Sequence, residues 1–335
     1  MSAPGVSEPE WDAAVAALRG ATQVVLACHQ RPDGDALGSM LALALGLHRL
    51  GIPALPSFPA PFEVPEPLAF LPGLDLLLPP AKVPAAPDLL VTLDAGSVPR
   101  LGDLADRVTA AAAVLVVDHH ASNTRFGTLH LVDEHAAATA VLVAELLARL
   151  GVPLDADLAT CLYVGLVSDT GSFRYAGTTP AVHALAGRLL ATGIRPDVIS
   201  RRLFDSHPYG WQAMLGEVLR RSRLEPDAVG GRGLVWTWVA DADLAGRGLP
   251  ADQAETVIDV VRTAREAEVA VVLKELGGEC VVSVRSRGEV DVGAACAALG
   301  GGGHRFAAGF TSYADRAATM AALRTELARV AGSPG

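Results

Sequence analysis

The sequence predicts an α/β fold, in which a domain built on a parallel sheet is followed by a smaller α+β domain. From about residue 21 to residue 193, short apolar runs alternate with helical stretches rich in alanine and leucine, which is typical of a parallel sheet covered by helices. Strands predominate after Leu224. Because 335 residues, half of them hydrophobic, can form two buried cores, we place the first domain at residues 1–200, a helical linker at 201–223 and the second domain at 224–335.

The expected elements follow the apolar runs and their spacing. Strands are expected at residues 24–28, 89–93, 114–117, 233–240, 269–276 and 280–285. Helices are expected at residues 36–50, 137–150, 156–167, 180–191, 251–264 and 314–330. Residues 53–87 are rich in proline and are expected to be irregular, while residues 196–223 are typical of a polar helical connector that Pro208 interrupts.

Composition and charge exclude several classes of protein. The formal net charge of −10 argues against binding to long duplex nucleic acid, but it is compatible with a small phosphorylated ligand whose acidic site holds divalent cations. The four cysteines show no CxxC spacing, so neither a disulfide framework nor a thiolate zinc site is indicated. The N-terminus lacks the pattern of a secretion signal, and no apolar stretch reaches the ~18 residues of a membrane span. We therefore expect a cytoplasmic protein.

Acidic residues and histidines follow three predicted strands and one predicted helix. The side chains concerned are His29, Asp33, Asp35, Asp94, Asp118, His119, His120 and Asp169. In open parallel sheets, ligands bind beyond the carboxyl ends of the strands. The pattern therefore predicts that these side chains form one polar site at that edge of the sheet.

Imidazole and carboxylate ligands without a thiolate suit Mn²⁺, or Fe, Co or Zn. The ligands exceed what one ion needs, and two ions that share one carboxylate form the arrangement used for in-line displacement at phosphorus. Adjacent histidines cannot easily bind the same ion from one strand, so one of His119 and His120 is expected to contact the substrate. The simpler alternatives are that Asp33 only caps the following helix and that the paired histidines are exposed loop residues. The accumulation of acids favours the metal site, because buried carboxylates are costly without a compensating cation.

Four motifs resemble those of the DHH phosphoesterase family, in the same order along the chain. They are His29-x-x-x-Asp33-x-Asp35, Leu93-Asp94-Ala95-Gly96, Asp118-His119-His120 and Ser168-Asp169-Thr170. The resemblance implies that one manganese ion is held by His29, Asp33 and Asp94, and a second by Asp35, Asp94, His119 and Asp169. It also implies that His120 contacts the scissile phosphate and that Asp118 supports the metal site.

A glycine-rich segment and two arginines are the candidate substrate residues of the second domain. Gly300-Gly301-Gly302-Gly303-His304 resembles the GGGH element of the DHHA1 domain, which implies that Gly301, Gly302, Gly303 and His304 bind the substrate, with backbone N–H groups near an anion. Arg285 and Arg287 are expected on one face of a strand, where they could bind phosphate. A flexible loop and a solvated charged face are the respective alternatives. For Phe173, stacking on a base and packing in the core both stay open.

The combination of domains is similar to NrnA-like members of the family. It implies a manganese-dependent enzyme that hydrolyses short oligoribonucleotides to mononucleotides and pAp (3′-phosphoadenosine 5′-phosphate) to AMP and phosphate. A cyclic di-AMP or linear pApA phosphodiesterase is the first alternative, and a non-catalytic nucleotide-binding regulator is the second. We expect no membrane partner, and the resemblance alone suggests a homodimer.

Overall fold

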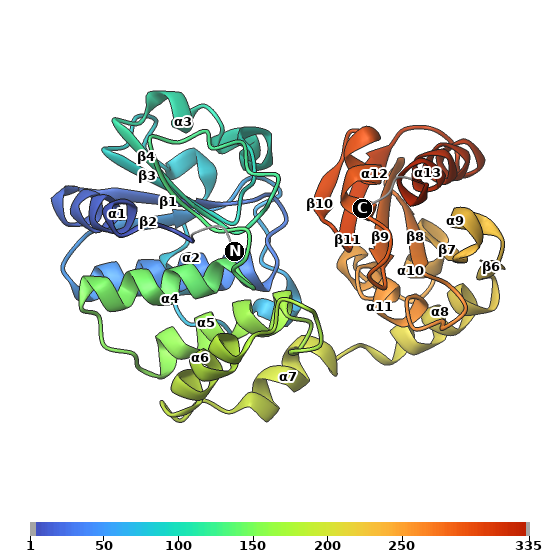
Figure 1. Ribbon diagram of the computed structural model, residues 1–335. Coiled ribbons are helices and arrows are strands. Elements are labelled where there is room, and N and C mark those ends of the chain that lie inside the picture. The colour runs from blue at the N-terminus through green and yellow to red at the C-terminus, as the bar shows by residue number, and fades with distance from the viewer. Residues whose placement is uncertain (1–4, 333–335) are drawn as a thin grey trace. The chain divides into compact units, whose positions relative to one another are not determined.

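The computed structural model describes residues 5–332 and divides the chain into two compact units (Figure 1). The first unit extends to Ser206 and the second begins at His207. This change of unit falls within the range predicted as a helical linker, whose limits stay a prediction. No helix formed by the described residues is long and apolar enough to cross a membrane.

The first unit contains a five-stranded sheet in the order β2-β1-β3-β4-β5, and every neighbouring pair is parallel. Its strands are β1 (Val24–Cys28), β2 (Ala54–Ser57), β3 (Leu89–Leu93), β4 (Ala113–Asp118) and β5 (Leu129–Val132). The central strands consist mainly of apolar residues, and nearly all of their residues are buried, as is usual in parallel sheets. The predicted parallel sheet is therefore confirmed.

The register aligns the ends of the three central strands. Cys28 lies opposite Leu93, and Leu93 lies opposite Val117. The residues that follow these positions, His29, Asp94 and Asp118, consequently lie at the same level of this edge, and Asp118 is the last residue of β4. β3 lies between β1 and β4, so Asp94 occupies the middle of this edge.

Helices and 3₁₀ turns complete the first unit. The helices are α1 (Glu8–Gly20), α2 (Gly34–Arg49), α3 (Arg107–Ala110), α4 (Thr139–Leu150), α5 (Ala156–Asp169), α6 (Pro180–Leu190) and α7 (Pro196–Phe204). The 3₁₀ turns are η1 (Glu66–Leu68), η2 (Leu74–Leu76), η3 (Pro80–Lys82) and η4 (Val98–Leu104). The segment 53–87, predicted to be irregular, contains β2 and three of these turns. We did not predict α1, whose buried face consists of Trp11, Ala14 and Leu18.

Helix α2 packs closely against α5, and two glycines make this contact possible. A Cβ atom at Gly38 would lie 2.4 Å from the backbone oxygen of Cys161 in α5. At Gly165 in α5, a Cβ atom would in turn lie 2.7 Å from Oδ1 of Asp35 in α2. The absence of side chains at these positions brings the first turn of α2, with Asp35, close to the C-terminal half of α5.

The second unit contains a mixed six-stranded sheet in the order β10-β11-β9-β8-β7-β6. Its strands are β6 (Arg223–Glu225), β7 (Leu234–Ala240), β8 (Val269–Leu276), β9 (Glu279–Ser286), β10 (Gly302–His304) and β11 (Ala307–Ser312). Its helices are α8 (Tyr209–Arg220), α9 (Ala228–Gly231), α10 (Asp241–Ala245), α11 (Val257–Val261), α12 (Val292–Ala298) and α13 (Arg316–Ala331), with the 3₁₀ turn η5 (Ala251–Ala254). β7 and β8 are parallel, whereas the other neighbouring strands are antiparallel. This mixed sheet with helices confirms the predicted α+β character of the second domain.

One expected helix is shorter than the sequence pattern indicates. We predicted a continuous helix over residues 251–264, but the structure contains η5 and the short α11. This segment is rich in β-branched residues, which lose side-chain freedom in a helix and so lower its stability.

Candidate active site

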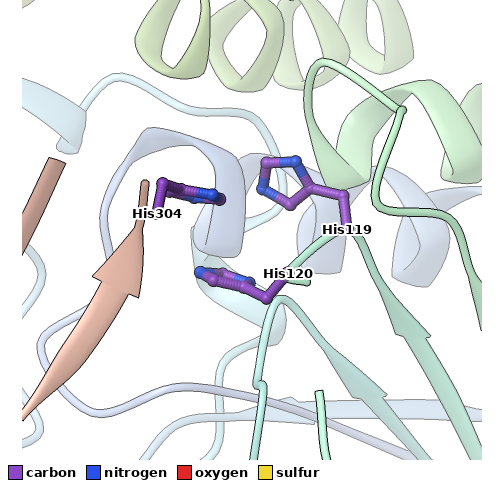
Figure 2. Close-up of side chains that lie close together, drawn as sticks. All are labelled: His119, His120 and His304. Carbon is purple, nitrogen blue, oxygen red and sulfur yellow. The ribbon is translucent and has the colours of Figure 1, made fainter. Parts of the chain in front are cut away.

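The candidate site of the first unit begins where β1, β3 and β4 end. His29 follows β1, Asp94 follows β3, and His119 and His120 follow β4. Figure 2 shows the side chains of His119 and His120 close together. The two imidazole rings meet edge to face, with centroids 5.1 Å apart and an interplanar angle of 67°. The adjacent histidines therefore present their nitrogens in different directions, as different roles for the two rings require.

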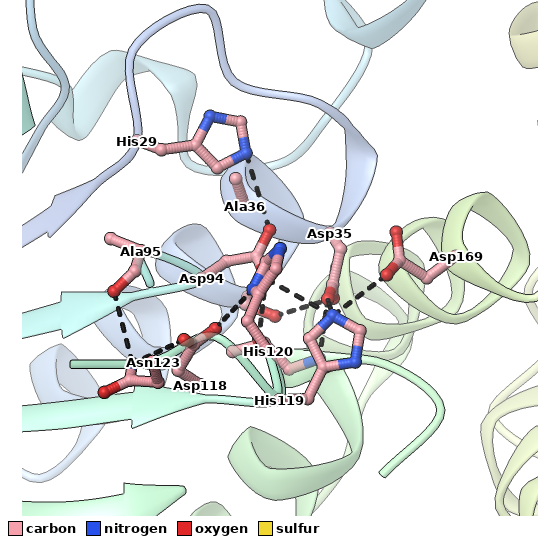
Figure 3. Close-up of polar contacts among 12 residues, drawn as sticks. His29, Asp35, Ala36, Asp94, Ala95, Asp118, His119, His120, Asn123 and Asp169 are labelled. Atoms are coloured by element: carbon pink, nitrogen blue, oxygen red, sulfur yellow. Dashed lines mark hydrogen bonds and ion pairs between the residues drawn. The ribbon is translucent and has the colours of Figure 1, made fainter. Parts of the chain in front are cut away.

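Asp94 lies among the histidines (Figure 3). Its Oδ2 is 3.5 Å from Nε2 of His29, and its Oδ1 is 3.5 Å from Nε2 of His119 and 3.6 Å from Nδ1 of His120. Its backbone has a φ of 56°, in the left-handed region. This region is uncommon for residues other than glycine, but aspartate and asparagine adopt it more readily than most. This conformation turns the side chain at the end of β3 while the backbone N–H still donates to the carbonyl of Val117.

Asp94 belongs to three groups of potential ligand atoms, and in each group one atom from each residue lies within 4.8 Å of the others. Two of these groups, His29 with Asp33 and Asp94 and Asp35 with Asp94 and His119, match the predicted metal positions. The third consists of Asp94, Asp118 and His120. Asp169, at the end of α5, places Oδ2 3.0 Å from Nε2 of His119. The structure thus brings together all six residues that were predicted as metal ligands, and their role as ligands stays a prediction.

Asp33 combines helix capping with a position at the site. Its Oδ1 accepts hydrogen bonds from the N–H groups of Asp35 and Ala36, which caps α2. Its Oδ2 lies 3.7 Å from Nε2 of His29. Capping occupies Oδ1 and the predicted metal position lies next to Oδ2, so the two roles that we had treated as alternatives are compatible.

Asp35 is fully buried and is held mainly by the start of α4. Its Oδ2 accepts from the N–H of Thr139 at 2.6 Å, and its Oδ1 accepts from the N–H of Ala140 at 2.9 Å and from the hydroxyl of Ser39 at 3.1 Å. Its Oδ2 is also 3.8 Å from Nε2 of His119. The carboxylate is thus fixed at the N-terminus of a helix, where negative charge is favourable.

Each histidine that follows β4 has one nitrogen fixed by a protein acceptor. Nδ1 of His119 lies 3.0 Å from the carbonyl of Ala136, so its proton points to that oxygen and Nε2 is directed to the acids. Nδ1 of His120 lies 2.7 Å from Oδ1 of Asp118, a buried carboxylate whose Oδ2 accepts from the amide of Asn123 at 2.5 Å. Asp118 is therefore oriented by its neighbours, as expected of a supporting residue.

The pKa values reflect the concentration of charge. Burial raises the pKa of Asp35 well above its usual range and raises that of Asp169 to about 6. Burial acts to lower the pKa of His29, but the carboxylates of Asp33 and Asp94 outweigh it and raise this pKa to about 10. For Asp94, burial is outweighed by His29, His120 and His119, which hold its pKa below the usual range. The cluster of carboxylates thus strongly favours a positive charge in its midst. Its potential ligand atoms are carboxylate oxygens and imidazole nitrogens, which suit divalent cations such as Mn²⁺.

Three residues at this site were missed in the sequence: Thr139, Asn123 and Ser39. Thr139 precedes the apolar run of α4, Asn123 follows His120 by three residues, and Ser39 follows Asp35 by four. None of these positions forms a recognisable sequence motif on its own. Phe173, for which we left two roles open, packs against the core of the first unit, and its ring stacks on that of His183 with centroids 5.1 Å apart. This favours core packing over base stacking.

The glycine-rich segment of the second unit forms the edge strand β10. A Cβ atom at Gly301 would lie 2.1 Å from the oxygen of Gly309, and one at Gly303 would lie 2.6 Å from that of Ala307. These glycines are therefore required by the packing of β10 on β11. At Gly302 a Cβ atom would meet no heavy atom of the described chain within 4 Å, which leaves room for a ligand, and His304 ends the strand.

The two candidate arginines lie at and beyond the end of β9. Arg285 is within the strand, opposite Ala270 of β8 and Ala307 of β11, and donates to the carbonyl of Val284 at 3.1 Å. Arg287 follows the strand and donates to the carbonyl of Ala264 at 3.2 Å. Their function in substrate binding stays a prediction.

The loop that carries Arg287 is held by Glu268. Its Oε1 accepts from the hydroxyl of Ser286 and from the N–H groups of residues 287–290, at distances between 2.7 and 3.4 Å. Burial opposes the charged form, but these donors outweigh it and lower the pKa of Glu268. A carboxylate with a lowered pKa stabilises the fold above its usual pKa of about 4.3, and this contribution is lost as the pH falls through the lower value.

We therefore expect Glu268→Gln to lower the free energy of unfolding by about 1–2 kcal/mol at neutral pH, because a charged acceptor becomes neutral. The difference between wild type and variant should shrink as the pH falls below about 4. Urea unfolding of both proteins at several pH values measures this difference in the free energy of unfolding. A difference that is constant with pH would contradict the charged role of this carboxylate.

Comparisons with known proteins agree on one family. Residues 23–166 match the model of the DHH family N-terminal domain, and residues 235–329 match that of the DHHA1 domain. The chain is 34% identical over 314 residues to the bifunctional oligoribonuclease and PAP phosphatase NrnA of Thermus thermophilus, covering 91% of this chain and 90% of that protein. It is 26% identical to the protein of the same name from Bacillus subtilis, over 87% of this chain and 89% of the relative.

Solved structures show the same fold. An exopolyphosphatase-related protein from Bacteroides fragilis superposes with a TM-score of 0.87 at 21% identity, covering 97% of both chains. RecJ of Thermus thermophilus, in complex with Mn²⁺, gives a TM-score of 0.53 at 18% identity, covering 97% of this chain and 56% of RecJ.

Proposed function

Because the chain belongs to the DHH family of phosphoesterases, which are hydrolases, we propose that it uses two Mn²⁺ ions to hydrolyse short oligoribonucleotides to mononucleotides and pAp to AMP and phosphate. The observation that carries this proposal is the position of Asp94, which belongs to both groups of residues that are proposed to hold an ion. Its relatives from Thermus thermophilus and Bacillus subtilis, named as bifunctional oligoribonuclease and PAP phosphatase, support the choice of substrates.

The residues present fit two divalent cations. His29, Asp33 and Asp94 would hold one ion, and Asp35, Asp94, His119 and Asp169 would hold the other. The buried carboxylates and the raised pKa of His29 indicate a position at which added positive charge is favourable. When bound, the ions supply Lewis acidity, which activates water and neutralises charge on the phosphoryl oxygens.

His120 is proposed to contact the scissile phosphate. Oδ1 of Asp118 lies 2.7 Å from its Nδ1 and so fixes the orientation of the ring. Burial acts to lower the pKa of His120, but Asp118 and Asp94 outweigh it and raise this pKa, which favours the protonated ring. A positively charged donor stabilises the charge that develops on the phosphoryl oxygens.

The second unit is proposed to bind the part of the substrate that is not cleaved. Gly302 is exposed, a Cβ atom there would have space around it, and His304 ends the same strand. Gly301 and Gly303 shape this strand, and Arg285 and Arg287 add positive charge. Such donors suit a phosphate or a nucleotide rather than a long duplex, in agreement with the acidic charge of the chain.

Turnover assays with the full chain test the proposal. Purified protein with Mn²⁺ is incubated with RNA of a few nucleotides, pAp, cyclic di-AMP and linear pApA, and kcat/KM is measured for each. We expect hydrolysis of the short RNA and of pAp. Turnover of cyclic di-AMP or pApA alone would identify the phosphodiesterase alternative, and nucleotide binding without any product would identify the regulator.

His120→Gln is expected to lower kcat by about 10²- to 10³-fold, because the charged donor to the phosphate is lost while the amide can still contact Asp118. The affinity for Mn²⁺, measured by calorimetry without substrate, should stay close to that of wild type. The exposed His135 provides the matched control, since His135→Gln should preserve both values. A variant at position 120 with wild-type kcat would contradict the assigned role.

A further inference from the structure

Thr139 contacts the acids of both proposed metal positions. Its hydroxyl donates to Oδ1 of Asp94 at 2.9 Å, and its backbone N–H donates to Oδ2 of Asp35 at 2.6 Å. The side chain is fully buried. We propose that Thr139 is a positioning residue that fixes the carboxylate of Asp94 in the orientation needed to share two cations. This inference rests on the proposed two-metal function and names a residue on which that function depends.

The start of α4 explains why Thr139 is held so firmly. The residue at the N-cap position is Ala138, whose side chain cannot accept a hydrogen bond from the first turn. Asp35 takes this role from another helix, since it accepts from the N–H groups of both Thr139 and Ala140. The backbone of Thr139 is therefore fixed on one proposed ligand while its hydroxyl is directed at another.

The hydroxyl of Thr139 acts on one particular oxygen of Asp94. Oδ1 faces His119, and Oδ2 faces His29, each at 3.5 Å. Rotation about the terminal torsion of an aspartate side chain is only weakly restricted by its own geometry. A donor on Oδ1 restricts this rotation and keeps one oxygen directed to each group of ligands. Asp94 would then be ordered before the cations bind, so less conformational freedom would be lost on binding.

A pair of substitutions separates the hydroxyl from the rest of the side chain. Thr139→Val keeps the shape and the N–H bond to Asp35 but removes the donor to Asp94, whereas Thr139→Ser keeps the donor. Thr237 provides a matched control, because it is also fully buried and its hydroxyl donates to the carbonyl of Val218 at 2.7 Å in the second unit. Thr237→Val thus loses a comparable buried hydrogen bond away from the acids.

The first measurement is calorimetric titration of each full-length protein with Mn²⁺ in the absence of substrate. We expect Thr139→Val to bind Mn²⁺ about 10- to 100-fold more weakly, as is usual when a group that orients a metal ligand is removed. Thr139→Ser should recover most of the affinity, and Thr237→Val should not change it. Circular dichroism and thermal unfolding of the metal-free proteins establish that each variant is folded.

The second measurement is turnover of the best substrate over a range of Mn²⁺ concentrations. Thr139→Val should require more Mn²⁺ and should have a lower kcat with little change in KM, because Thr139 is fully buried. A folded Thr139→Val protein with wild-type affinity for Mn²⁺ would overturn the positioning role of Thr139 but not the proposed function. A wild-type chain that binds no divalent cation would overturn the proposed function as well.

Discussion

Replacement of Asp94 by asparagine is expected to lower kcat/KM by at least about 10³-fold and to weaken binding of Mn²⁺. A single missing donor to a transition state commonly costs 10²- to 10³-fold, and Asp94 is the carboxylate that both groups of ligands share. Asparagine is the informative substitution because it tolerates a positive φ, such as the 56° at this position, better than alanine does. The loss can then be attributed to the charge and the second oxygen rather than to backbone strain.

Asp88 provides the control for this experiment, since it is exposed and lies just before the opposite end of β3. Asp88→Asn should preserve both turnover and affinity for Mn²⁺. Activity is measured on short RNA and on pAp, and affinity by calorimetry on the metal-free protein. If Asp94→Asn kept more than about a tenth of the activity with wild-type metal binding, Asp94 would not be the shared ligand.

The clustering of these side chains could be predicted from the sequence because most of them lie at or just beyond strand ends. The predicted limits of the strands at 24–28 and 89–93 agree with β1 and β3, since each is a run of apolar residues that ends abruptly at a polar one. Parallel strands that end at one edge bring such residues together whatever their separation along the chain. The order of the strands, which places Asp94 in the middle of the edge, depends on long-range pairing and was not accessible from the pattern.

Contacts made through space were beyond the sequence pattern for a different reason. Thr139 meets Asp94 and Asp35 from distant parts of the chain, and no periodicity records such a contact. The same is true of Glu268, which holds a loop that begins about twenty residues later. Short or partly exposed elements such as β5 and β10 were missed because their apolar signal is weak. The run of glycines was interpreted as a cradle for an anion, which stays a prediction, and the sequence did not reveal that Gly301 and Gly303 also allow close packing against β11.

Gly38→Ala is expected to lower the free energy of unfolding of the first unit by about 2–3 kcal/mol. Alanine favours a helix over glycine by about 1 kcal/mol, so a substitution within α2 would stabilise the protein if space allowed. Here the added methyl group would lie 2.4 Å from the backbone oxygen of Cys161, which cannot move without displacing α5. Overpacking should therefore outweigh the gain in helix propensity.

The same displacement should reach the metal site, because Asp35 lies in the first turn of α2 and Asp169 ends α5. We expect Gly38→Ala to bind Mn²⁺ more weakly even at temperatures at which it is folded. Urea unfolding, analysed separately for the two units, measures the stability. Gly187→Ala in α6 is the matched control, since a Cβ atom there meets no heavy atom of the described chain within 4 Å, and it should raise the stability by about 0.5–1 kcal/mol. If Gly38→Ala were as stable as Gly187→Ala, the close contact between α2 and α5 would not be what positions Asp35.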